Sequence, residues 1–95
     1  MKHNFIPIEQ ALKQIFKDYG REDEYYFAYL SSNWEQIIGK SLAKVSRPIA
    51  LKKKKLTLKT NTELWKNEFI KRTEQILEMI NRKTEGFEIK EINIF

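Results

Sequence analysis

Five lysines and no acidic residue fall within residues 49–60, in the stretch "PIALKKKKLTLKT" that runs from Pro48 to Thr60. The flanking residues, 1–48 and 61–95, carry net charges of +1 and −1, so this stretch accounts for the net charge of +5. Lysine ammonium groups bind phosphates as point charges and give affinity without reading bases. The stretch is therefore a candidate for a sequence-independent contact with a nucleic acid.

The candidate phosphate-binding residues are the four consecutive lysines and four cations close to them in the sequence. They are Lys52, Lys53, Lys54, Lys55, Lys59, Arg47, Lys44 and Lys66. Lys53 and Lys54 are the first choice, because a turn is predicted there and would expose both. If roughly four or five phosphates are neutralised, the logarithm of the affinity falls with the logarithm of the salt concentration at a slope of about −4. The alternative, a solvated turn that discourages edge-to-edge sheet pairing, stays open.

The sequence offers little for catalysis, metal binding or a cofactor. Its single histidine, His3, lies near a terminus that is expected to fray, and there is no cysteine. No Gly-rich phosphate loop is present. We therefore predict a non-enzymatic protein with no catalytic residue, no metal site and no cofactor.

The sequence also indicates where the protein works. The absence of cysteine fits a reducing cytoplasm. No apolar run approaches the ~18 residues of a membrane span, and the N-terminus lacks the apolar stretch of a signal peptide. A cytoplasmic protein with no membrane partner is predicted.

Apolar spacing predicts a first helix that begins at Pro7 and ends at Gly20. Its apolar stripe consists of Ile8, Leu12, Ile15 and Tyr19. Such a stripe is typical of a helix that packs against a core.

Two further helical regions follow. In residues 21–47, a capping box of Ser32 and Glu35 predicts a short helix up to about Leu30 and a longer one from Asn33. Gly39 inside the second is interpreted as permitting close approach of another element. In residues 60–86, a capping box of Thr60 and Glu63 predicts one long helix.

Between these regions the apolar period changes to two, which predicts a β-hairpin with its turn near Lys53 and Lys54. Ile49 and Leu51 are expected on the same face. The turn lacks Asn-Gly or Asp-Gly, so a loop slightly longer than two residues is predicted. The C-terminal "FEIKEINIF" is a strand that either contains a bulge near Glu91 or starts late, near Lys90.

These elements predict one α+β domain over residues 1–95, with residues 1–5 flexible. The order is α-α-β-β-α-β: N-terminal helices, a β-hairpin, a long helix and a C-terminal strand. This layout predicts a three-stranded sheet with helices on one face, as in a small KH-like domain. No GxxG sequence is present to clamp a nucleic-acid backbone as nucleic-acid-binding KH domains do.

The aromatic residues favour core positions over base stacking. Trp34 and Trp65 both lie on apolar stripes at helical spacing and are interpreted as core. The cluster of Tyr25, Tyr26 and Tyr29 lies beside three acids and is a candidate docking surface if it exceeds what core packing requires.

Four blocks of the sequence together resemble the DciA family, also called domain-of-unknown-function family 721. "NWEQIIGKSLAKVSRP" looks like the family's signature, with the matching residues Trp34, Ile37, Ile38, Gly39, Leu42 and Ala43. "IPIEQALKQIFKDYG", "KLTLKTNTELWKNEF" and "ILEMINRKTEGFEIKEINIF" are similar to its first helix, its strand-to-helix block and its close. Where the family usually has a glycine in the hairpin, this sequence has four lysines.

The resemblance implies a KH-like bacterial protein that assists loading of the replicative helicase of the DnaB type and binds DNA. On this interpretation the partners are that helicase and DNA, single-stranded or tailed, bound without sequence preference through the lysine-rich hairpin. Two alternatives remain: a protein-interaction adaptor without DNA binding, and an RNA-binding KH-like domain.

Overall fold

The computed structural model describes residues 8–95, so His3, Pro7 and the predicted flexible residues 1–5 lie outside the described residues. Six helices and three strands make up this part of the chain. The helices are α1 (Ile8–Asp18), α2 (Glu22–Ser32), α3 (Trp34–Ile38), α4 (Lys40–Ala43), α5 (Glu63–Lys71) and α6 (Thr73–Lys83). The strands are β1 (Ser46–Lys52), β2 (Lys55–Thr60) and β3 (Glu91–Ile94).

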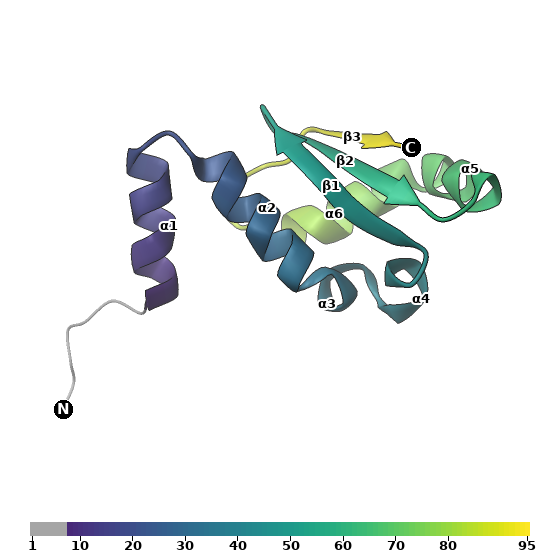
Figure 1. Cartoon of the computed structure of the whole chain (residues 1–95), viewed down its shortest axis with the longest axis horizontal. Coiled ribbons are helices and arrows are strands. Elements are labelled where there is room, and N and C mark those ends of the chain that lie inside the picture. The colour runs from purple at the N-terminus through teal and green to yellow at the C-terminus, as the bar shows by residue number, and fades with distance from the viewer. Residues whose placement is uncertain (1–7) are drawn as a thin grey trace.

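The three strands form one sheet in the order β1-β2-β3. β1 and β2 are antiparallel, whereas β3 runs parallel to β2 and is reached through α5 and α6. The helices other than α1 gather on one face of the sheet, and the other face is open to solvent (Figure 1). The predicted α+β class, the order of elements and the three-stranded sheet are confirmed.

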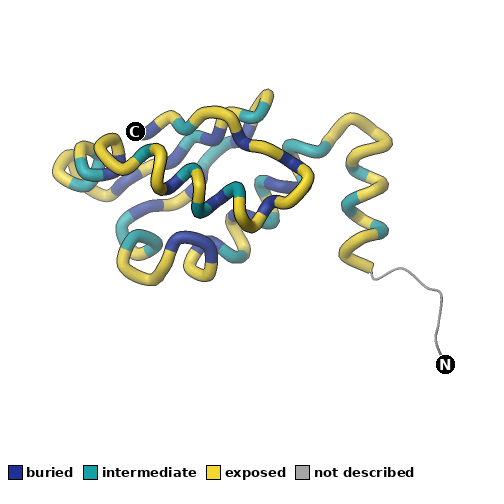
Figure 2. Tube along the Cα trace, turned by 180° about the vertical axis from the view of Figure 1, so that it is seen from behind, coloured by how far each residue is buried: buried dark blue, intermediate teal, exposed yellow. Residues whose placement is uncertain are grey.

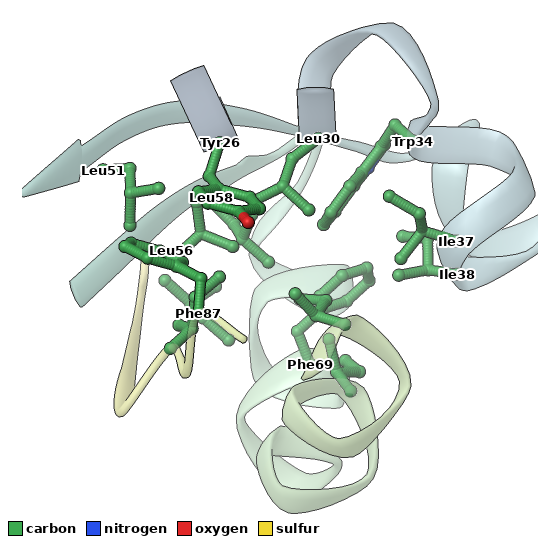
Figure 3. Packing of buried hydrophobic residues seen from close by; sticks show 14 residues of the cluster. Tyr26, Leu30, Trp34, Ile37, Ile38, Leu51, Leu56, Leu58, Phe69 and Phe87 are labelled. Carbon is green, nitrogen blue, oxygen red and sulfur yellow. The ribbon is translucent and has the colours of Figure 1, made fainter. Parts of the chain in front are cut away.

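The core lies between the sheet and these helices. Leu56 and Leu58 of β2 are fully buried and point toward Leu30 of α2 and Phe69 of α5 (Figure 3). Because side chains alternate along a strand, burying these leucines turns the residues between them toward solvent. The core therefore fixes which hairpin residues lie on the open side of the sheet.

The predicted long helix is interrupted at Arg72, between α5 and α6. The hydroxyl of Thr73 donates to the carbonyl oxygens of Phe69 and Ile70, at 3.2 and 2.9 Å. Hydroxyl groups that bond back to preceding carbonyls compete with the helical ladder and bend helices. The helix also begins later than predicted, because Thr62, not Thr60, caps it by accepting a hydrogen bond from the Trp65 amide at 3.2 Å.

The second helical region is divided into three short helices. The capping box predicted at Ser32 does not form, since Ser32 is the last residue of α2 and Asn33 precedes α3 without a side-chain cap. Gly39 separates α3 from α4 with a φ of 93°. A Cβ there would meet nothing within 4 Å, so the predicted close approach is wrong. Gly39 is needed for its backbone conformation, which other residues adopt only under strain.

The strands differ from their predicted forms in two details. The register of β1 shifts between Pro48 and Ala50, so Ile49 occupies a bulge and does not share the face of Leu51. Pro48 has no N–H to donate to the ladder, and β1 is an edge strand, where proline and bulges are tolerated. β3 begins at Glu91, which confirms the late start of the last strand.

The first helix forms as predicted but does not bury its apolar stripe. No residue of α1 is buried, and Ile8, Leu12, Ile15 and Tyr19 are exposed. Figure 1 shows α1 standing apart from the sheet beside α2, and Figure 2 shows only half-buried and exposed residues along it.

Candidate nucleic-acid interface

The two strands of the hairpin are joined by a two-residue turn of Lys53 and Lys54, flanked by the paired residues Lys52 and Lys55. Lys53 has a φ of 52° and Lys54 a φ of 63°, and positive φ at both central residues is the hallmark of a type I′ turn. The predicted longer loop is therefore wrong. The left-handed conformation costs a non-glycine residue ~1–2 kcal/mol, so contacts outside the turn must stabilise it.

The backbone of this turn is held by the Asp23 side chain of α2 and by two backbone amides where β3 begins. The Lys53 amide donates to a carboxylate oxygen of Asp23 at 2.9 Å. The Lys54 carbonyl oxygen accepts hydrogen bonds from the amides of Lys90 and Glu91, at 2.8 and 3.4 Å. Asp23 lies 30 residues before Lys53, so the sequence around the turn does not predict this hydrogen bond.

Replacing Lys53 with asparagine is expected to raise the free energy of unfolding by about 1 kcal/mol, because asparagine tolerates the left-handed conformation that lysine adopts with strain. The same change removes one hairpin cation. Urea denaturation checks the stability, and Lys53→Ala is the matched control, since it removes the same cation but leaves a residue that adopts the left-handed conformation with strain. A stability gain from Lys53→Ala equal to that from Lys53→Asn would contradict the explanation.

The two lysines of the turn differ in exposure. Lys53 is exposed, but Lys54 is half-buried, with its ammonium nitrogen 5.2 Å from the centroid of the Phe87 ring. Phe87 is itself buried and stacks on Tyr26 with ring centroids 4.2 Å apart. A cation over an aromatic face is attracted to the ring. The expectation that the turn exposes both lysines therefore holds for Lys53 only.

Four other hairpin cations lie together on the side of the sheet away from the helices, which we call the open face. The antiparallel register places Arg47 opposite Lys59 and Lys52 opposite Lys55, and all four are exposed. Like charges directly opposite each other destabilise a pair of strands. The hairpin thus holds two like-charged pairs where neutral pairs would be more stable.

The four cations of the open face form an extended strip along the hairpin. Lys55 and Lys59 are four residues apart on β2, about 13 Å at the ~3.3 Å rise of a strand. Arg47 and Lys59 lie near one end and Lys52 and Lys55 near the turn. A strip of this length can contact several successive phosphates of one backbone.

The remaining predicted residues, Lys44 and Lys66, lie near the end of the strip that is far from the turn. Lys44 is exposed just before β1, and its carbonyl oxygen accepts a hydrogen bond from the Asn61 side chain at 3.3 Å. Lys66 is half-buried near the start of α5, the helix that follows β2. Lys44 therefore lies two residues before β1, and Lys66 lies on a neighbouring helix outside the strip.

The cations of the open face are not neutralised by ion pairs. Within residues 8–95 the ion pairs join Arg21 to Glu24, Arg72 to Glu68 and Arg82 to Glu78, all close in sequence and away from the hairpin. The one acid that the register places on the strip is Glu91 of β3, opposite Lys55. The open face is therefore available to an anionic ligand.

Base stacking has little support at this face. The hairpin contains no aromatic residue, and Phe87 is buried in the core. Phe95 at the end of the sheet is 54% exposed. The predicted tyrosine surface is reduced as well, because Tyr26 belongs to the core and burial raises the pKa of its hydroxyl. The arrangement suits phosphate contacts and not base recognition.

A metal site and a membrane-spanning helix were also looked for in the part of the chain that is described. Residues 8–95 contain no group of three histidine, aspartate or glutamate side chains placed to hold a metal ion. Across the same residues, no helix has the length and apolar character needed to span a membrane.

Comparison with protein families gives a match over nearly the whole chain. Residues 7–94 match the model of the family described as "Dna[CI] antecedent, DciA". No curated protein matches the chain.

Proposed function

The chain belongs to the DciA family, and on this premise we propose that it is a non-enzymatic accessory of DNA replication. It contacts the replicative helicase of the DnaB type and holds DNA, without sequence preference, through the open face of its hairpin. The match over residues 7–94, nearly the whole chain, is the observation that carries the proposal.

The geometry of the open face supports the DNA part of the proposal. Arg47, Lys52, Lys55 and Lys59 present four exposed cations on a solvent-facing strip. Phosphate contacts from such groups position a protein on DNA but carry no base information. Cations that face each other across the two strands weaken the hairpin. A sequence that keeps such pairs is expected when the cations bind an anionic ligand.

The DNA part is tested by titrating single-stranded, duplex and tailed DNA over a range of salt concentrations. With about four phosphates neutralised, the slope of log affinity against log salt is expected near −3.6 for duplex and near −2.8 for single strands. An affinity that does not change with salt would contradict phosphate binding by the open face. Tighter binding to RNA than to DNA of equal length would favour the RNA-binding alternative.

The helicase part is tested separately by mixing the immobilised chain with the purified replicative helicase of the same cells. We expect the helicase to be retained, and to be retained equally after nuclease treatment, which removes any DNA bridge. If well-folded protein retains no helicase, the adaptor alternative with another partner replaces this part of the proposal.

A further inference from the structure

Helix α1 presents its apolar side to solvent and its polar side to the rest of the molecule. Ile8, Leu12, Ile15 and Tyr19 lie on one stripe and are between 45 and 78% exposed. On the opposite side of the helix, Lys13 lies over the ring of Tyr26, at 5.9 Å from its centroid. Amphipathic helices normally turn their apolar stripe inward, so this orientation leaves an apolar surface that nothing within residues 8–95 covers.

The space between α1 and the body confirms this orientation. A hollow of about 370 Å³ separates them, and the α1 residues along it include Gln10, Lys13 and Lys17. Glu22 and Glu85 line its other side. Besides Lys13, α1 contacts α2 through Phe16, whose ring centroid lies 5.9 Å from that of Tyr25. An 11-residue helix with so few contacts is marginally stable in water by itself.

The spacing of the stripe identifies what can cover it. The intervals from Ile8 through Leu12 and Ile15 to Tyr19 are four, three and four residues, which is the a/d pattern of a two-helix coiled coil. This pattern is the same when read in reverse. A two-fold axis between Leu12 and Ile15 can therefore relate two antiparallel copies of the stripe. Leu12 of each copy then lies opposite Ile15 of the other, and Ile8 lies opposite Tyr19.

The charge of α1 does not oppose pairing with a second copy in this orientation. α1 contains two acids, Glu9 and Asp18, and two lysines, so it is neutral in a chain of net charge +5. When two copies meet through α1, the surfaces that come together carry no net charge. The antiparallel arrangement places the two basic sheets on opposite sides of the dimer, far from each other. We propose that α1 pairs with α1 of a second copy of this chain to form an antiparallel homodimer.

The dimer is weak, because an 11-residue helix is only about 16 Å long and covers less than the ~800 Å² per partner of a standard interface. Sedimentation velocity of the full chain over rising concentration is expected to show a shift from monomer to dimer. Replacing both Leu12 and Ile15 with glutamine is expected to raise the dissociation constant by about tenfold or more, since both lie at the interface centre. Leu64→Gln is the matched control, because Leu64 is 77% exposed on α5 and outside the stripe.

Cysteine cross-linking tests the orientation, since the chain contains no cysteine of its own. A mixture of the Ile8→Cys and Tyr19→Cys chains is expected to form a mixed disulfide rapidly. Either chain alone is expected to cross-link slowly, because the antiparallel pairing holds the two copies of one position about 16 Å apart along the axis.

Three results would overturn the proposal. They are a chain that stays monomeric at every concentration, a dimer that the Leu12→Gln, Ile15→Gln variant leaves intact, and rapid cross-linking of Ile8→Cys alone. Hydrogen exchange gives an independent measure: α1 amides should become protected as concentration rises. Protection that appears only when a different protein is added would assign the stripe to that protein and exclude the dimer.

Discussion

Replacing both Arg47 and Lys59 with glutamate is expected to weaken DNA binding by about a hundredfold at ~50 mM salt, because it removes two of roughly four phosphate contacts and adds repulsion. The slope of log affinity against log salt is expected to fall by about half. Fluorescence anisotropy with a labelled oligonucleotide at several salt concentrations measures both quantities.

The paired geometry separates loss of binding from loss of folding. Arg47 and Lys59 are opposite each other, so the double change replaces one like-charged pair with another and is expected to leave stability nearly unchanged. Lys59→Glu alone places opposite charges across the strands and is expected to raise the free energy of unfolding by up to about 1 kcal/mol. This single variant should therefore be more stable and bind DNA less well, which no general unfolding effect produces.

Lys71→Glu combined with Lys83→Glu provides the control, because it changes the net charge equally at exposed positions on α5 and α6, outside both the open face and α1. This variant is expected to lose only a few-fold in affinity, through the weaker long-range attraction. Equal losses from the control and from the open-face variant would mean that net charge alone determines binding, and would contradict a located site.

The sequence predicted the hairpin and its cations but not the pairing of Arg47 with Lys59 across the two strands. Period-two spacing around residues 52–55 requires a turn, so the hairpin follows from local pattern. The register that pairs Arg47 with Lys59 depends on the bulge at Ile49, which the pattern did not reveal. The tight turn depends on Asp23, a partner 30 residues away. Long-range contacts of this kind leave no local signal.

Helix α1 is a second case in which the local sequence predicts an element but not its contacts. Its 3.6-residue period correctly predicted a helix with an apolar stripe, because periodicity reports the shape of a segment. Periodicity does not report what covers the stripe, and in the monomer nothing in the described chain buries it. The inward packing that the stripe suggested is therefore not observed.

The two tryptophans could not be distinguished from the sequence, since both lie on apolar stripes of helices. In the structure Trp34 is 6% exposed and Trp65 is only half-buried against the core. Trp34 also makes a buried polar contact, because its indole N–H donates to the Ser46 hydroxyl at 3.1 Å. That hydroxyl in turn donates to the carbonyl oxygen of Leu42 at 2.7 Å, so Trp34 ties α3 and α4 to the first residue of β1.

Trp34→Ala is expected to lower the free energy of unfolding by about 3–5 kcal/mol, through lost burial and the cavity left behind. A domain of this size is stable by only ~5–15 kcal/mol, so the variant is expected to lie near the limit of folding. Trp65→Ala should cost clearly less, because part of that side chain already contacts water. Urea denaturation followed by circular dichroism compares the two variants.

A milder variant, Ser46→Ala, separates the hydrogen bond from the burial of the ring. Ser46→Ala keeps the ring but leaves the indole N–H without its partner, which is expected to cost about 1–3 kcal/mol. Because Ser46 directly precedes Arg47, loosening this anchor should also disturb the far end of the open face and reduce DNA affinity in the folded protein. Equal destabilisation by Trp34→Ala and Trp65→Ala, or no effect of Ser46→Ala on either stability or binding, would show that Trp34 does not anchor the hairpin.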